Sequence, residues 1–121
     1  MDIRVENLNE KAGLIHELLA CKIIARLNDY HFKLVKARRE FIWHHHNETD
    51  EMFMVIEGKM KIALRERTLE LGEGELVIIP RGVDHKPLCE ELCTVLLVEP
   101  AGTTNTGNAG GALTHTRVEW I

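Results

Sequence analysis

The strongest constraint on the fold of this chain is a series of short β-prone runs that extends from residue 22 to residue 100. The runs are rich in β-branched, aromatic and other apolar residues, and turn-forming residues separate one run from the next. Many short strands at such spacing are typical of a β-sandwich or a β-barrel, so we expect an all-β fold. The expected strands have the sequences KIIARL, YHFKLVKA, FIWHHH, EMFMVIEG, KMKIALRE, TLEL, ELVIIP and LCTVLLVEP.

The two ends of the chain differ from this central part. In the stretch LNEKAGLIHELLA, which follows Asn7, apolar residues recur at helical spacing, so we expect a short helix before Cys21. The segment from 101 to 111 is rich in Gly and Thr, which is typical of a loop or linker. The length of 121 residues suits one domain. We expect a single domain over 1–121, with a helical extension at 1–21, a barrel at 22–100, and a loop and C-terminal tail at 101–121.

Two histidines lie two positions apart near the middle of the sequence. If the residues from 43 to 46 form a strand, His44 and His46 point to one face of it and His45 points to the other. Neutral imidazoles are ligands for Zn, Fe, Ni and Cu ions, and a carboxylate beside them adds the negative charge that holds a divalent cation. Glu51 follows a polar turn and opens the next expected strand, so it can return toward the two histidines.

A second segment, GEGELVIIPRGVDHKP, supplies another histidine at a defined place. Gly74 opens this segment, a buried strand follows, and Pro80 and Gly82 form a tight turn before His85. Proline has a fixed φ and no backbone donor, whereas glycine can take a positive φ, so the chain can reverse sharply at this turn. We therefore expect His85 to be the fourth ligand of the same metal site.

Both segments resemble the paired motifs of the cupin superfamily, and the resemblance covers about residues 30 to 100. The first motif has the form H-x-H, three or four residues, E, six residues and G, and it is matched by His44, His46, Glu51 and Gly58. The second has the form G, five residues, P-x-G, two residues, H, three residues and N, and it is matched by Gly74, Pro80, Gly82 and His85. Cys89 stands where the second motif usually has Asn, which is outside the ligand set.

The resemblance implies a cupin-type double-stranded β-helix, or jelly-roll, barrel that holds one divalent metal ion. The implied ligands are His44, His46, Glu51 and His85. The most similar group is the small single-domain cupins often called mannose-6-phosphate-isomerase-like, and the segment EPAGTTNTG is similar to a tail segment in some of them. Membership of this superfamily does not imply one reaction.

Some histidines are best explained without a metal, and for the others such explanations remain open beside the metal site. His16, His31 and His115 are interpreted as surface or hydrogen-bonded residues. A chance polar run or an adventitious metal patch would explain three consecutive histidines, but it would leave Glu51 and His85 unexplained. A cupin that kept the ligands and binds nothing is a further alternative.

The ligand set limits what the site can do. Three imidazoles and one carboxylate leave one or two positions on a six-coordinate ion, which we expect to be Fe, Mn, Ni or Zn. One hypothesis is an enzyme, either a small-molecule dioxygenase or an isomerase. The alternatives are a non-catalytic module that binds a small metabolite or senses metal and, less favoured, a structural metal. A sugar-phosphate isomerase needs cations in its pocket, and Arg65, Arg67 and Arg81 are as readily surface charges.

Composition excludes some partners and suggests a location. The formal net charge of −4 and the pI near 6.0 leave no basic stripe, so we expect no binding to nucleic acid or to anionic membranes. No apolar run approaches the ~20 residues of a membrane span, and the N-terminus lacks a signal-peptide pattern. Cys21, Cys89 and Cys93 include no C-x-x-C pair, which favours reduced thiols in the cytoplasm. A redox role for Cys89 and Cys93, close across a hairpin, is the less favoured alternative.

The run EMFMVIE is apolar on both faces. If Glu51 faces the metal, the opposite face carries Met52, Met54 and Ile56, where a solvated strand would carry polar residues. The N-terminal helix or a second subunit could cover this face. We expect a homodimer on this ground.

Overall fold

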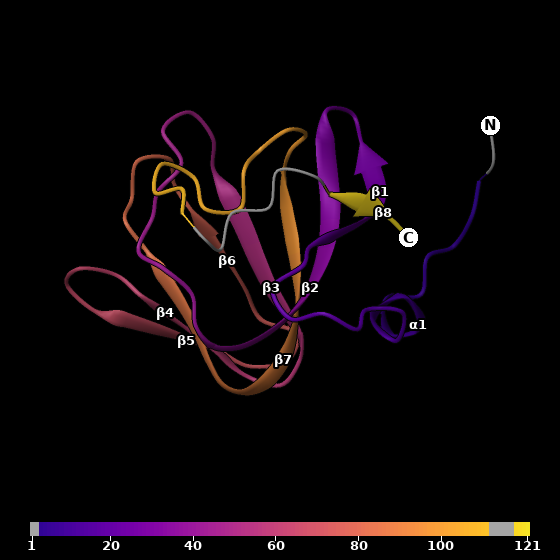
Figure 1. Ribbon diagram of the computed structural model, residues 1–121, viewed down its shortest axis with the longest axis horizontal. Helices are drawn as coiled ribbons and strands as arrows, with labels where there is room; N and C mark the ends of the chain where they lie inside the picture. Colours follow the sequence, from indigo (N-terminus) through magenta and orange to yellow (C-terminus); the bar gives the residue numbers. More distant parts are fainter. Residues whose placement is uncertain (1–2, 112–117) are drawn as a thin grey trace.

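The structure is a computed structural model that describes residues 3–111 and 118–121, and it is built almost entirely of β-strands (Figure 1). The elements are α1 (Leu8–Ala12), β1 (Lys22–Leu27), β2 (Tyr30–Glu40), β3 (Glu51–Glu57), β4 (Met60–Ala63), β5 (Thr68–Leu71), β6 (Leu76–Ile79), β7 (Lys86–Pro100) and β8 (Glu119–Trp120). The prediction of an all-β jelly-roll fold with a short N-terminal helix is confirmed. His115 lies outside the described residues.

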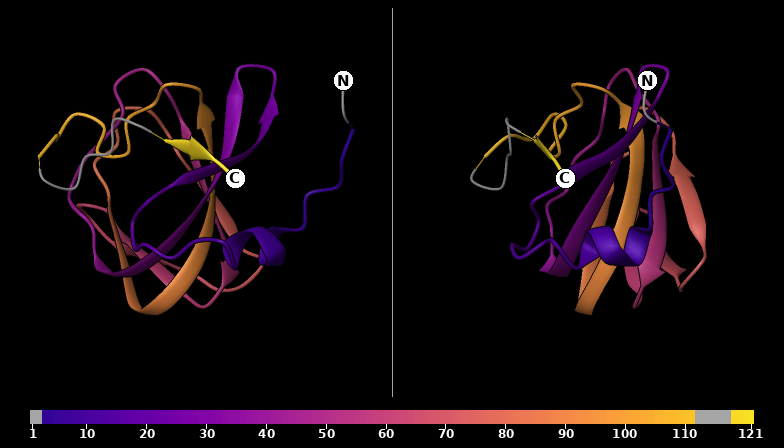
Figure 2. Two further views of the ribbon diagram at one scale, coloured as in Figure 1. Left: turned by 45° about the vertical axis from the view of Figure 1, so that its right-hand side comes forward. Right: turned by 90° about the vertical axis from the view of Figure 1, so that its right-hand side faces the viewer.

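The long strand β7 organises the sheet. Most of its length pairs with β2, its C-terminal part also pairs with β3, and its N-terminal part pairs with β4. The order β5-β4-β7-β2-β1-β8 continues on both sides, while β6 pairs with β3. The pairs are antiparallel except that of β1 with β8. The strands wrap around a common interior, as the views in Figure 2 show, and β5, β6 and β8 form the edges of the described sheet.

The interior follows the two-residue period of the strands. On β3 the inward set is the expected one, with Glu51 3%, Phe53 4% and Val55 0% exposed. Inward residues of β2, β4, β5, β6 and β7 complete this core; they include Val35, Ala37, Met60, Ile62, Leu71, Ile79, Val95 and Leu97. Each such side chain contributes roughly 1.5–3 kcal/mol when it is fully removed from water, so this core is the main source of stability.

A second apolar cluster covers the outer face of β2, β3 and β7. Met52, Met54 and Ile56 are half-buried there and pack against a cluster that contains Ala12 and Ile15 from the N-terminal segment. The chain's own N-terminal segment therefore covers part of the face that the sequence left unexplained. Figure 2 shows α1 lying across the face of these strands.

The helix is shorter than the sequence pattern indicated. Asn7 caps α1, since its Oδ1 accepts a hydrogen bond from the backbone N–H of Glu10 at 3.0 Å, but the helix ends at Ala12. Gly13 follows at once, and glycine costs helix stability. Leu19 then takes a φ of 63°, which brings the chain into the barrel. No helix in the described part of the chain is long and apolar enough to cross a membrane.

The prediction of three reduced thiols is wrong for two cysteines. Cys89 and Cys93 form a disulfide with a Cα–Cα distance of 6.4 Å, and Cys21 remains free. Both bonded cysteines lie on β7 and not across a hairpin. They pair with Arg39 and Ala37 of β2, so the disulfide spans a bulge of three exposed residues at 90–92. The argument for a cytoplasmic location from reduced thiols therefore no longer holds.

Candidate metal centre

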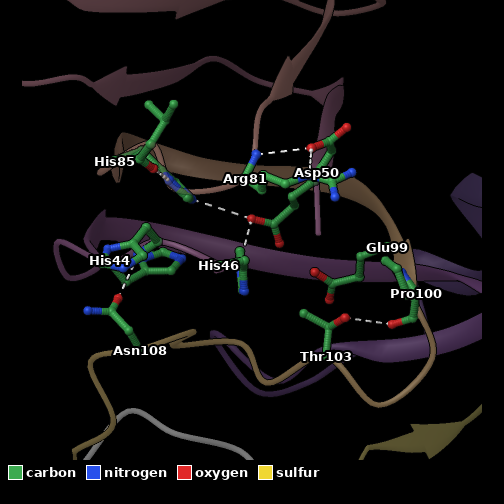
Figure 3. A network of polar contacts seen from close by, with 12 residues as sticks. His44, His46, Asp50, Arg81, His85, Glu99, Pro100, Thr103 and Asn108 are labelled. Carbon is green, nitrogen blue, oxygen red and sulfur yellow. Dashed lines mark hydrogen bonds and ion pairs between the residues drawn. The ribbon is translucent and has the colours of Figure 1, made fainter. Parts of the chain in front are cut away.

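The structure brings the four sequence-predicted ligand residues together inside the barrel (Figure 3). His44, His46, Glu51 and His85 are all buried, and each offers one ligand atom that lies within 4.8 Å of the other three. Their exposed fractions are 3%, 7%, 3% and 1%. Residues far apart in the sequence thus form one compact cluster, which we call the His3Glu cluster.

Loop segments, more than strand interiors, position these side chains. The run 41–46 was expected to be a strand, but it forms only an isolated bridge, in which His44 and His85 exchange backbone hydrogen bonds of 3.0 and 2.9 Å. The regular pairing of β2 with β7 is interrupted after Ala37, resumes at Arg39 and Glu40, and ends there, before this run begins. The carbonyl of His46 accepts a hydrogen bond from Gly82 N at 2.8 Å, so the tight turn before His85 is tied to the same segment.

His45 does not join the His3Glu cluster. Its Nδ1 lies 2.8 Å from Oδ1 of Asp84, and its side chain is 26% exposed. The chain at 44–46 is extended although it is not part of a named strand, so alternate side chains still point to opposite sides. The expected separation of His45 from its two neighbours therefore holds in the geometry.

Hydrogen bonds fix two of the imidazoles in the tautomer that a metal requires. His44 Nδ1 donates to the carbonyl of Ile42, and His85 Nδ1 donates to the carbonyl of Val83, both at 2.9 Å. A carbonyl can only accept, so each Nδ1 carries the proton and each Nε2 keeps its lone pair. His85 Nε2 is buried and has no hydrogen-bond partner among the described residues. A buried lone pair of this kind fits a metal ligand.

The electrostatics of the cluster also suit a cation. Burial, opposed by the hydrogen bond to Ile42 and aided by the neighbouring His85, lowers the pKa of His44 to about 4, so the ring is neutral at neutral pH. Burial opposes ionisation of Glu51, but the imidazoles of His46 and His85 beside it outweigh this effect and hold the pKa of this carboxyl well below its ordinary value. Glu51 Oε1 lies 3.2 Å from His46 Nε2 and 3.4 Å from His85 Nε2. One carboxylate and three imidazoles match the ligands of a divalent transition metal.

A buried ion pair beside the cluster was missed by sequence reasoning. Lys33 Nζ donates to Glu99 Oε1 at 2.9 Å, and the two side chains are only 4% and 1% exposed. Burial raises the pKa of Glu99 well above its ordinary value, and the negative charge of Glu51 raises it further. The available signal was the strand period, because Lys33 is in phase with inward Val35 and Glu99 with inward Leu97.

A cavity adjoins the His3Glu cluster. It has a volume of about 60 Å³ and is bounded by His44 and Glu51 as well as by mostly apolar side chains. A water molecule needs ~10–15 Å³ on this measure, so the cavity holds a handful of waters or part of a small molecule. Its apolar boundary includes Val35, Phe41, Phe53, Leu88, Val95 and Leu97.

The Gly- and Thr-rich segment 101–111 folds back onto the cluster as a series of turns and is not a free linker. Asn108 Oδ1 accepts from His45 N at 2.7 Å, and Asn108 N donates to His45 O at 3.0 Å. Gly107 has a φ of 53°, and a Cβ there would clash with His45 O. Thr106 is completely buried. Close approach of this loop to the histidine segment therefore depends on glycine at 107.

The strand order and the His3Glu cluster both agree with the resemblance to cupins, and comparison with known proteins decides to which family the chain belongs. Residues 30–99, more than half of the chain, match the Cupin domain family. The chain belongs to the cupin family. Both motif segments lie within the matched range. The departure of this cupin from the second motif, Cys89 in place of Asn, places one half of the disulfide at the cavity.

Several known proteins, two of them with solved structures, are similar to this cupin. A cupin-2 domain protein from Shewanella frigidimarina is 46% identical, with a TM-score of 0.78, and the match covers 79% of this chain and 94% of that one. Protein NMB1881 from Neisseria meningitidis is 29% identical, with a TM-score of 0.74, over 81% of this chain and all of that one. The uncharacterized protein YdbB from Bacillus subtilis is 32% identical over 69% of this chain and 74% of that one. The names of these three proteins do not say which reaction, if any, they catalyse.

Proposed function

We propose that this cupin binds one divalent transition-metal ion, Fe, Mn, Ni or Zn, through His44, His46, Glu51 and His85. We propose further that the site is open to a small molecule. The observation that carries the second proposal is the cavity, because His44 and Glu51 belong both to the His3Glu cluster and to its boundary. A molecule in the cavity would lie directly beside the cluster, as expected for a catalytic or ligand-binding metal and not for a closed structural one.

Within this proposal each part of the chain has a role. The carbonyls of Ile42 and Val83 orient two imidazoles, and Glu51 supplies the negative charge. The apolar cavity and the 101–111 loop limit access of water, which strengthens electrostatic interactions at the site. A bound ion would polarise a substrate oxygen or supply redox chemistry, depending on its identity.

The proposal covers two uses of such a site. One is a small-molecule dioxygenase or isomerase, and the other is a non-catalytic module that binds a metabolite or senses metal. The three arginines considered in the sequence, Arg65, Arg67 and Arg81, do not support a sugar phosphate as the ligand. Arg65 lies 3.5 Å from Asp84 and Arg81 lies 3.2 Å from Asp50, all at the surface, and neither these arginines nor Arg67 bounds the cavity. The mannose-6-phosphate-isomerase-like grouping thus remains a resemblance in sequence.

We also propose a homodimer. Part of the outer face remains apolar after the N-terminal segment has packed, since Leu76 and Ile78 of the edge strand β6 are 54% and 57% exposed. In the ladder these residues lie opposite Met54 and Met52, which extends the same apolar face to the sheet edge. An exposed apolar edge strand is a surface that a second copy would cover.

Metal content tests the ligand assignment. Protein purified without added metal should contain about one divalent ion per chain by elemental analysis. His46→Ala and His85→Ala should each remove most of it, whereas the matched control His45→Ala should retain it. Equal metal loss in all three variants would contradict the assignment.

Ligand exchange tests whether the site is open. Acetohydroxamate, a small bidentate oxygen ligand, should change the absorption spectrum of the Co(II)-loaded protein. The metal-free protein should keep its β-sheet circular dichroism with a modest loss of melting temperature. A spectrum that ignores the ligand, or a metal-free protein that unfolds outright, would point to a structural metal. An oxygen-uptake screen with chelating substrates then separates an oxygenase from a binding module.

A further inference from the structure

One cationic side chain bounds the cavity, and nothing described so far accounts for it. Arg39 lies on β2 two and four residues beyond Ala37 and Val35, and all three bound the cavity. Arg39 therefore bounds the cavity and is also exposed to solvent, unlike the buried Ala37 and Val35. Its neighbour Arg38 is equally exposed and does not bound the cavity.

Arg39 also lacks a carboxylate partner among the described residues. Other cations near the site have one: Lys33 pairs with Glu99, and Lys86 Nζ lies 3.3 Å from Glu40 Oε1. No ion pair or side-chain hydrogen bond of Arg39 occurs in the described part of the chain. A guanidinium presents five donors in a rigid fork that matches a carboxylate, so its unused donors at a cavity mark a place for an anion.

The backbone holds Arg39 in an unusual conformation. Its φ is 69°, a region that costs a non-glycine residue free energy, and it follows the irregularity at which Arg38 of β2 lies opposite the disulfide-closed bulge of β7. Strain of this kind persists only where the surrounding structure imposes it. Arg39 pairs with Cys89 of β7, which also bounds the cavity, so the ladder holds Arg39 at this place.

We propose that Arg39 binds the carboxylate of a small acidic ligand whose apolar chain lies in the cavity. The opposite end of the ligand carries the oxygen atoms that reach the metal. This assignment rests on the proposed open metal site and specifies the class of molecule that it takes. The apolar boundary of the cavity, with Phe41 and Leu88 beside Arg39 in it, suits a hydrocarbon chain between two polar ends. A single guanidinium matches one carboxylate in charge and in bidentate geometry.

Matched pairs of chelators test this assignment on the Co(II)-loaded protein. Adipate monohydroxamate and hexanohydroxamate have the same chain length and the same chelating group, and only the first carries a carboxylate. The shorter glutarate monohydroxamate and the longer suberate monohydroxamate, each with its alkyl counterpart, test other distances between the carboxylate and the chelating group. Dissociation constants are measured from the cobalt absorption spectrum for the wild type, Arg39→Met, Arg39→Lys and the control Arg38→Met.

In the wild type we expect the carboxylate to tighten binding about ten-fold for at least one chain length, as a charge-assisted contact at a partly exposed site would do. Arg38→Met should keep this preference, Arg39→Lys should keep part of it, and Arg39→Met should abolish or reverse it. The alkyl hydroxamates should bind all four proteins alike. If hydroxamates bind but the wild type shows no preference for the carboxylate-bearing ones, or if Arg39→Met keeps that preference, the role of Arg39 is overturned and the open metal site stands. If no hydroxamate perturbs the cobalt spectrum of the wild type, the open metal site itself is overturned.

Discussion

The contact between the 101–111 loop and the histidine segment gives a sharp prediction about Gly107. Gly107→Ala places a methyl group against His45 O and 3.2 Å from His46 Nδ1, and it puts a Cβ at a φ of 53°. The conformational cost of alanine at positive φ is about 1 kcal/mol. Displacement of the loop also breaks the two hydrogen bonds between His45 and Asn108, each worth about 1 kcal/mol. The total loss in the free energy of unfolding is therefore about 3 kcal/mol.

Gly110 in the same loop provides the matched control. Its φ is 64°, but a Cβ there would meet nothing within 4 Å. Gly110→Ala should therefore carry only the conformational cost of about 1 kcal/mol. Urea unfolding of the metal-free proteins measures both losses, and cobalt titration should show about ten-fold weaker binding for Gly107→Ala alone, because the loop supports His46. Equal losses in the two variants would refute the argument that this loop is docked through Gly107.

Three further predictions follow from burial and exposure. The pKa of His44 is about 4 in the folded chain and 6.5 for an unperturbed histidine, so its contribution to the free energy of unfolding is complete above pH 6.5 and is lost as the pH falls through 4. The metal-free protein should lose about 3 kcal/mol of this free energy over that range. His44→Gln should show a shallower loss in urea titrations. Burial raises the pKa of the Cys21 thiol to about 12, so the native chain should resist alkylation by iodoacetamide at about pH 8. After denaturation without reductant, an Ellman assay should count one free thiol, and a count of three would mean that the disulfide is absent. Ile78→Lys should shift a sedimenting dimer to a monomer while Leu27→Lys should not, and a monomeric wild type at micromolar concentration would remove the basis for the dimer.

Much of the fold was predictable because it depends on local pattern. The two-residue period of EMFMVIE placed Glu51, Phe53 and Val55 on the inner face, and the turn at Asn28 separated β1 from β2 as expected. The four cluster residues could be chosen because turn chemistry and strand period act over short distances. The pattern also indicated that an apolar outer face needed a cover.

The remaining features depend on tertiary contacts that no local pattern contains. The helix stopped at Ala12 although the apolar spacing continued, because Ile15 packs on the sheet instead. The disulfide between Cys89 and Cys93 arises from a bulge of β7 whose position is set by pairing with β2. The role of Lys33 could not be assigned because its partner Glu99 lies on another strand, and a charged residue in a strand is usually at the surface.

The position of β7 has a consequence for the order in which the molecule assembles. Its ladder with β2 joins Tyr30 to Pro100 and Glu40 to Leu88, so the barrel needs contacts between residues far apart in the chain, which form slowly. During synthesis the N-terminal half emerges first, and its two imidazoles and one carboxylate form an incomplete donor set. The fourth residue of the cluster, His85, and the covering loop arrive afterwards. Metal capture is therefore expected to follow closure of the barrel, at whatever place in the cell the complete chain folds.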